Sequence, residues 1–192
     1  MRYLSIDIET TGLDPEKCQI IEVGAVIDDL TKPDIAINDL PVYHCYVKQN
    51  EYSGTPFALS MHPEKFRRIA NEEPGYNYLY PGDVWYDLKA FLLMNKWTEG
   101  PLILAGKNVA SFDYQFLKRL RNFGSDFGIS HKMMDPAMLY LRPDDDVLPG
   151  LDVCMDRAGI KGEVPHNAVD DAKLVIQVLR AYYSNKGETR DE

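Results

Sequence analysis

The chain has 192 residues, of which 45% are hydrophobic and 27% are charged, and its formal net charge is −9. This length accommodates one domain with a sizeable core, and this composition excludes both a disordered protein and a membrane-embedded one. The excess of acids argues against broad electrostatic binding of long polyanions, because that affinity comes chiefly from Lys and Arg.

Location and redox state follow from simple counts. No apolar run approaches the ~20 residues that cross a bilayer, and Asp7 interrupts the N-terminal apolar stretch too early for a signal peptide. We therefore expect no membrane association and a cytoplasmic location. Cys18, Cys45 and Cys154 are odd in number and lack C-x-x-C spacing, which predicts reduced, mostly structural thiols.

The N-terminal part of the chain reads as strands followed by helices. Leu4, Ile6 and Ile8 alternate with polar residues, so a strand is expected over 2–9, with a turn at Thr10-Thr11-Gly12. Further strands are predicted over 20–27 and 41–47, and the short connections favour an antiparallel meander. Apolar residues at helical spacing predict helices over 63–71 and 83–97.

The C-terminal part alternates between strand and helix. Residues 72–82 are rich in turn formers and aromatics and are expected to form an ordered loop that covers substrate. A short buried strand is predicted over 102–106, then helices over 110–123, 136–141, 150–158 and 168–183. These elements predict an α/β domain with a mixed sheet over residues 1–184 and a polar tail over 185–192.

Three groups of residues suggest chemistry, and the first is Asp7 with Glu9. Their i, i+2 spacing places both carboxylates on one face of an apolar strand, where ionised acids need a partner or a cation. Either they bind metal or they face water at a strand edge.

The second and third groups lie at predicted helix starts. Asp113 falls in a first turn, where the helix dipole favours an anion, so it is either a metal ligand or an ordinary N-terminal acid. His166 precedes the last helix and Asp171 falls in its first turns, so both can reach one site. Histidine readily exchanges a proton near neutral pH. Asp170 competes with Asp171, but neighbours on a helix point about 100° apart, so only one faces the site.

Together these segments resemble the DEDDh group of exonucleases, which includes the bacterial polymerase proofreading subunit, RNase T and oligoribonuclease. Residues 7–13 are similar to the first motif of that group, Asn108 to Asp113 to its N-x-x-F-D motif, and His166 to Asp171 to its H-x-A-x-x-D motif. Asp135-Pro136 and residues 148–160 are similar to further family features. The resemblance implies a ribonuclease H-like fold with a five-stranded mixed sheet, whose second strand is antiparallel to the rest and which helices flank.

The resemblance also implies roles. Asp7, Glu9, Asp113 and Asp171 would hold two Mg²⁺ or Mn²⁺ ions, as suits hard cations with oxygen ligands. His166 would be the general base of a two-metal 3′→5′ exonuclease that releases nucleoside 5′-monophosphates. The acids themselves account for part of the negative charge, and bound cations would reverse its local sign.

Substrate contacts are expected around the first two motifs. Thr10, Thr11, Gly12 and Leu13 would contact the terminal nucleotide, with Leu13 either a wedge between bases or a buried turn residue. Phe112 either stacks on a base or belongs to the core, and Asn108 either contacts substrate or braces its loop.

Substrate choice is expected to lie in residues 49–82, which match no family pattern. The acidic composition favours a single-stranded DNA or RNA 3′ end over a long duplex. Basic clusters within 102–132 and at Lys65, Arg67 and Arg68 are either a substrate-binding face or solvated helix faces. A homodimer and a polymerase or replication partner are both compatible with the resemblance.

Two other functions remain compatible with the sequence. One is a nucleic-acid-binding module of the same fold that lacks catalysis. The other is a phosphoesterase acting on small phosphates. Only a nuclease would shorten labelled oligonucleotides in a metal-dependent way.

Overall fold

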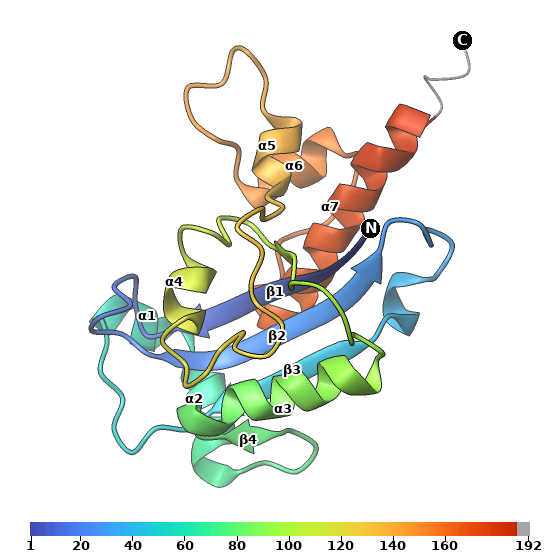
Figure 1. Cartoon of the computed structure of the whole chain (residues 1–192). Helices are drawn as coiled ribbons and strands as arrows, with labels where there is room; N and C mark the ends of the chain where they lie inside the picture. The colour runs from blue at the N-terminus through green and yellow to red at the C-terminus, as the bar shows by residue number, and fades with distance from the viewer. Residues whose placement is uncertain (188–192) are drawn as a thin grey trace.

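A five-stranded sheet in the order β4-β3-β2-β1-β5 forms the centre of the computed structural model, which describes residues 1–187 (Figure 1). β1 (Arg2–Thr10), β2 (Ile20–Asp29) and β3 (Val42–Val47) make the predicted antiparallel meander. β4 (Tyr78–Leu79) runs parallel to β3, and β5 (Leu104–Ala105) runs parallel to β1. The second strand is therefore antiparallel to the other four, as the ribonuclease H-like resemblance implies.

Strand alternation divides the core between the two faces of the sheet. Leu4, Ile6 and Ile8 of β1 point to one face and pack with residues of α3 (Pro81–Met94) and α4 (Asp113–Leu117). Tyr3 points to the other face and packs with α7 (Ala168–Gly187). Figure 1 shows α3 and α7 on opposite sides of the sheet.

Shorter helices complete the layers around the sheet. They are α1 (Pro56–Met61), α2 (Pro63–Asn71), α5 (Pro136–Tyr140) and α6 (Leu151–Arg157), with a 3₁₀ turn at Ile37–Asp39. Proline at the first position starts α1, α2, α3 and α5, where its missing N–H costs no hydrogen bond. No helix within residues 1–187 is long and apolar enough to cross a membrane.

The predicted 72–82 loop contains an edge strand that the sequence pattern did not reveal. β4 pairs with β3 through hydrogen bonds from Tyr46 N to Asn77 O and from Lys48 N to Leu79 O, at 2.8 and 2.7 Å. The Tyr78 ring stacks on Tyr46, with centroids 5.7 Å apart. Two residues are too few for a period-two pattern, so cross-strand packing decides this strand.

The helix predicted over 110–123 is wrong in extent, since α4 covers only Asp113–Leu117. After Leu117 the backbone hydrogen bonds shorten to three-residue turns, and Asn122 adopts a φ of 59°. Successive tight turns present apolar side chains at spacings of three and four, so they imitate a helical pattern. The strand predicted over 102–106 is likewise shorter, since β5 covers only Leu104–Ala105. Isolated parallel bridges join Leu102 to Ile129 and Ala105 to Met134.

The last helix continues to Gly187, beyond the predicted end at Tyr183. The predicted polar tail therefore overlaps the helix at residues 185–187, and residues 188–192 of it lie outside the described part of the chain. The domain boundary at residue 184 stays a prediction.

Candidate carboxylate centre and nucleotide pocket

The end of β1 and the start of α7 come together on one face of the sheet. Ser5, Asp7 and Glu9 share that face by alternation, and Ser5 Oγ donates a 2.8 Å hydrogen bond to the Ala172 carbonyl of α7. This bond fixes the first turns of α7 over the acids of β1.

Gly24 on β2 permits this close approach. It lies opposite Asp7 in the strand register, and a Cβ placed there would lie 2.3 Å from the backbone carbon of Ala168. Any side chain at position 24 would thus push the start of α7 away from the sheet. Asp171, two residues beyond Val169, is 8% exposed, whereas Asp170 is exposed and accepts a hydrogen bond from Asn167 Nδ2. Of these neighbouring acids, only Asp171 faces the site.

Asp113 approaches from the opposite side, as the first residue of α4. It is 2% exposed, and its Oδ1 accepts a 3.2 Å hydrogen bond from the Ile8 N–H of β1. Burial raises the pKa of Asp113 to about 7. The sequence placed this acid in a first helical turn, and its burial between α4 and β1 is a tertiary feature.

The aspartates repel one another and lack compensating partners. Burial, and then the neighbouring charges of Asp113 and Asp171, raise the pKa of Asp7 well above its ordinary value. Burial also raises the pKa of Asp171 to about 6. Within the described chain, no hydrogen bond or ion pair reaches the Asp7 carboxylate, and the buried Asp171 Oδ1 has no hydrogen-bond partner.

This donor set fits divalent cations. Unpaired buried carboxylate oxygens are costly, and a hard cation removes that cost. Among residues 1–187, no three His, Cys, Asp or Glu side chains are grouped tightly enough to hold an ion between them.

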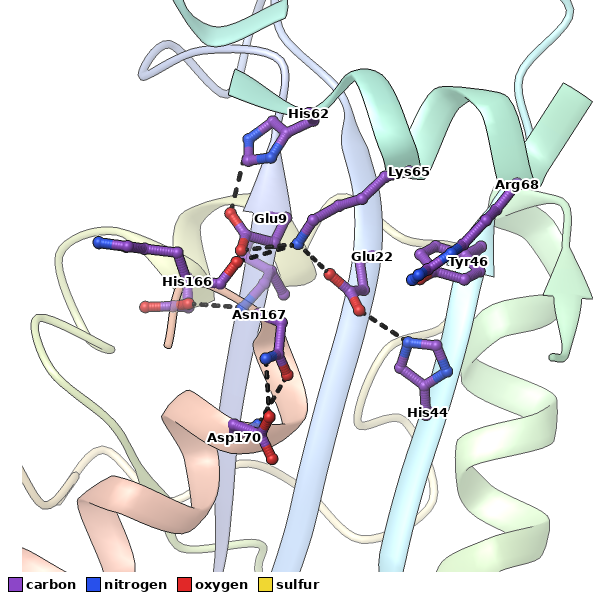
Figure 2. A network of polar contacts seen from close by, with 12 residues as sticks. Glu9, Glu22, His44, Tyr46, His62, Lys65, Arg68, His166, Asn167 and Asp170 are labelled. Carbon is purple, nitrogen blue, oxygen red and sulfur yellow. Dashed lines mark hydrogen bonds and ion pairs between the residues drawn. The ribbon is translucent and has the colours of Figure 1, made fainter. Parts of the chain in front are cut away.

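Glu9 is partnered by α2, a feature that the sequence did not predict. Lys65 Nζ donates a 2.9 Å hydrogen bond to Glu9 Oε1, and His62 Nε2 lies 3.6 Å from Glu9 Oε2 (Figure 2). Burial raises the pKa of Glu9 despite Lys65, and burial lowers the pKa of His62. His62 is the N-cap of α2 and stands three residues before Lys65, so both reach the end of β1.

His166 lies beside the acids on the turn that leads into α7. Its side chain is exposed and its backbone has a left-handed φ of 57°. The electrostatic effect of His166 partly opposes the rise that burial causes in the pKa of Asp171. Its carbonyl oxygen accepts a 3.3 Å hydrogen bond from Lys65 Nζ, and its imidazole is directed away from Lys65 (Figure 2). The turn therefore brings the histidine near Asp171 without burying it.

A pocket of ≈ 650 Å³ adjoins the end of β1. Its volume suits a nucleotide-sized ligand. Leu13 and Phe57 project at its rim and are 81% and 75% exposed. Four predicted substrate residues line the pocket: Thr10, Gly12, Leu13 and Phe112. The lining also includes Phe57, Ala58 and Met61 of α1 and His62, the residue between α1 and α2.

Two predicted substrate residues lie outside this lining. Thr11 is fully buried, and its Oγ1 donates to Ser53 O and accepts from Gln19 N, so it braces the loop before α1. The Asn108 N–H donates a 2.8 Å hydrogen bond to Asp135 Oδ2. This bond fixes the Asn108 backbone, which has the left-handed φ of 58° that asparagine tolerates, and the substrate role of Asn108 stays a prediction.

The comparison with family models decides the relationship. The model described as "Exonuclease" (RNase T) matches residues 4–179, which include all the acids described above. The chain belongs to this exonuclease family.

Individual relatives and structural neighbours differ considerably from this chain. The DNA polymerase III PolC-type of Clostridium perfringens is 28% identical over 194 residues, which cover 98% of this chain and 12% of the polymerase. Cell-death related nuclease 4 superposes with a TM-score of 0.66 at 13% identity, covering 96% of this chain and 64% of the nuclease. E. coli exonuclease I in complex with a dT13 oligonucleotide superposes with a TM-score of 0.63 at 18% identity, covering 99% of this chain and 42% of exonuclease I. The chain thus spans less than two thirds of these relatives, and the structural likeness shows the fold.

Proposed function

We propose that this chain is a metal-dependent 3′→5′ exonuclease that hydrolyses the terminal phosphodiester bond of single-stranded DNA or RNA and releases nucleoside 5′-monophosphates. The observation that carries this proposal is the set of unpaired aspartate oxygens, on Asp7 and Asp171, together with a nucleotide-sized pocket whose lining includes Glu9. Membership of the exonuclease family and the Asp113 carboxylate on the same site add support.

Four carboxylates would serve as the metal ligands. Asp7, Asp113 and Asp171 would supply the oxygens that now lack cationic partners, and Glu9 would join them from the position in which Lys65 holds it. When bound, two Mg²⁺ or Mn²⁺ ions would neutralise these carboxylates and the charge that develops on the scissile phosphate. Bound ions would bring the four carboxylates into one set of ligands.

His166 is the proposed general base. Its exposed position on a turn beside Asp171 lets the imidazole reach an attacking water without passing through the core. The electrostatic attraction between His166 and Asp171 would stabilise the imidazolium that forms when the proton is taken.

The pocket would hold the terminal nucleotide. Leu13, Phe57 and Met61 offer apolar surface to a base. Such packing would accept any of the bases. Phe112 lines the same pocket and also contacts Phe116, with ring centroids 5.2 Å apart, so stacking and core roles are compatible. The oligonucleotide bound to E. coli exonuclease I supports a single-stranded substrate. The likeness to a PolC-type polymerase supports a replication polymerase as a possible partner class.

The decisive experiment uses 5′-labelled single-stranded DNA and RNA of equal length with Mg²⁺ or Mn²⁺. We expect a ladder that shortens from the 3′ end and disappears with EDTA and in Asp7→Ala. Asp170→Ala is the matched control, because Asp170 is the neighbouring acid that faces away from the site.

Two other results would replace the proposal. Binding of the oligonucleotides without shortening under any metal would assign a binding module instead. Release of phosphate from mononucleotides, with oligonucleotides untouched, would assign a small-phosphate phosphoesterase.

A further inference from the structure

Two matching rows of side chains face each other between the sheet and α2. The strand register places Glu9 of β1 opposite Glu22 of β2, and Glu22 opposite Tyr46 of β3. His62 at the N-cap of α2 and Lys65 and Arg68 within it stand three residues apart, and they meet these strands in the same order, as Figure 2 shows. His62 meets Glu9, Lys65 meets both glutamates, and Arg68 meets Tyr46 at 3.0 Å.

Lys65 is the central member of the helix row and has three partners. Its Nζ lies 2.9 Å from Glu9 Oε1, 2.5 Å from Glu22 Oε2 and 3.3 Å from the His166 carbonyl oxygen. These partners belong to β1, β2 and the turn before α7. One buried ammonium group therefore joins three elements that surround the candidate site.

Glu22 is the fixed end of this arrangement. It is 3% exposed and also lies 2.8 Å from His44 Nε2. Burial opposes its charge, yet the hydrogen bond to His44 and the charge of Lys65 lower the pKa of Glu22 below its ordinary value. Directly opposed carboxylates repel one another unless a cation lies between them, so Glu9 and Glu22 both depend on Lys65.

A purely structural ion pair would need only Lys65 and Glu22. The additional contacts of Lys65 go to Glu9, a proposed metal ligand, and to the backbone of His166, the proposed base. We propose that Lys65 is a positioning residue that holds the Glu9 carboxylate and the His166 turn in their working places, anchored by Glu22. This inference rests on the proposed function.

The test compares Lys65→Met with Arg67→Met. Both substitutions remove one cation from α2, but the Arg67 side chain is 53% exposed and its ion pairs within the described residues are with Glu64 and Glu73. We expect Lys65→Met to lower kcat roughly tenfold or more, since small displacements of reacting groups cost that much. KM for a short oligonucleotide should change little, because Lys65 does not line the nucleotide pocket.

A second readout does not depend on activity. The imidazole resonances of His166, assigned with a His166→Gln variant, should shift in Lys65→Met and stay in place in Arg67→Met. If Lys65→Met fails to fold, the double variant Lys65→Met with Glu22→Gln removes the opposed charge as well and gives the same two readouts.

The outcomes separate this inference from the proposed function. If the unmodified chain cleaves no oligonucleotide, the proposed function is refuted. The His166 resonances would still test whether Lys65 positions the His166 turn. A kcat within about twofold of the Arg67→Met control, or His166 resonances that stay in place, overturns the role of Lys65.

Discussion

The candidate site gathers buried acids whose charges the metal-free protein leaves largely uncompensated. Asp113 is 2% exposed and accepts one backbone hydrogen bond, while the buried Asp171 Oδ1 accepts none. Such groups destabilise the fold when ionised. Their presence at one place is a mark of function, because perturbed carboxylates concentrate where charge is to be bound.

The stability of the metal-free protein should depend on pH through these acids. The folded-state pKa values of about 7 for Asp113 and about 6 for Asp171 exceed the ordinary value of 3.8. The folded protein therefore binds more protons than the unfolded chain across this range. The resulting stability is present at low pH and is lost as the pH rises through 6 and 7.

Urea unfolding in EDTA at a series of pH values between 5 and 8 measures this loss. Asp113→Asn, which cannot ionise, should show a shallower decline than the unmodified protein. Equal slopes would contradict the assignment. Added Mg²⁺ should stabilise the unmodified protein more at the upper end of this pH range than at the lower end.

Leu13 provides a second prediction at the residue scale. It is 81% exposed at the pocket rim, so Leu13→Ala should change the free energy of unfolding by less than about 0.5 kcal/mol. Lost contact with a nucleotide should raise KM roughly fivefold or more, with kcat affected less. Val147→Ala is the control, because Val147 is 77% exposed and lies outside the pocket lining. Equal KM values in the two variants would remove Leu13 from the substrate contacts.

At the level of elements, the site depends on the contact between β2 and α7. The Ser5 hydrogen bond and the absence of a side chain at Gly24 keep the start of α7 on the sheet. Thr11 has a similar bracing role for the loop before α1, because a Cβ on Gly54 would lie 2.2 Å from the Thr11 carbonyl oxygen. Backbone contacts thus position the segments that carry Asp171 and that line the pocket.

Gly24→Ala tests the first of these contacts. The added methyl would overlap Ala168, so we expect a loss of about 1–3 kcal/mol in the free energy of unfolding. Displacement of Asp171 should also weaken Mn²⁺ binding, measured by calorimetry. Gly82→Ala in α3 is the matched control, since a Cβ there meets nothing within 4 Å. Unchanged stability and Mn²⁺ affinity in Gly24→Ala would show that α7 adjusts freely.

Across the whole molecule, the predicted basic clusters are partly neutralised. Arg67 pairs with Glu64 and Glu73, Arg119 pairs with Glu16, and Lys107 Nζ lies 4.0 Å from Asp135. With a net charge of −9, the acids of the chain outweigh the cations that could meet a phosphate backbone. Binding should therefore depend on the pocket and on bound divalent ions more than on a basic track.

Salt dependence measures this balance. KM for a single-stranded oligonucleotide at saturating Mg²⁺ should change with monovalent salt with a log–log slope below about 2 in magnitude, as expected for few phosphate contacts. The Leu13→Ala variant should keep the same slope despite its raised KM. A steep slope would indicate an extended basic track and contradict the pocket-centred interpretation.

The sequence by itself determined the fold class and the identity of the acids. Strand alternation placed Asp7 and Glu9 on one face, and helix geometry separated Asp171 from Asp170. These predictions succeeded because they depend on local periodicity, which a sequence records directly. The three motifs also placed the chain among the exonucleases.

Only the tertiary structure decided what surrounds those acids. The partnership of Lys65 with Glu9 and Glu22 joins residues 56 and 43 positions apart in sequence, and β4 exists through packing against β3. The pocket likewise combines the turn after β1 with α1. Such contacts have no local pattern, because they arise when elements pack. The sequence spacing between His62 and Lys65 predicts neither the burial of the lysine nor its ion-pair partners.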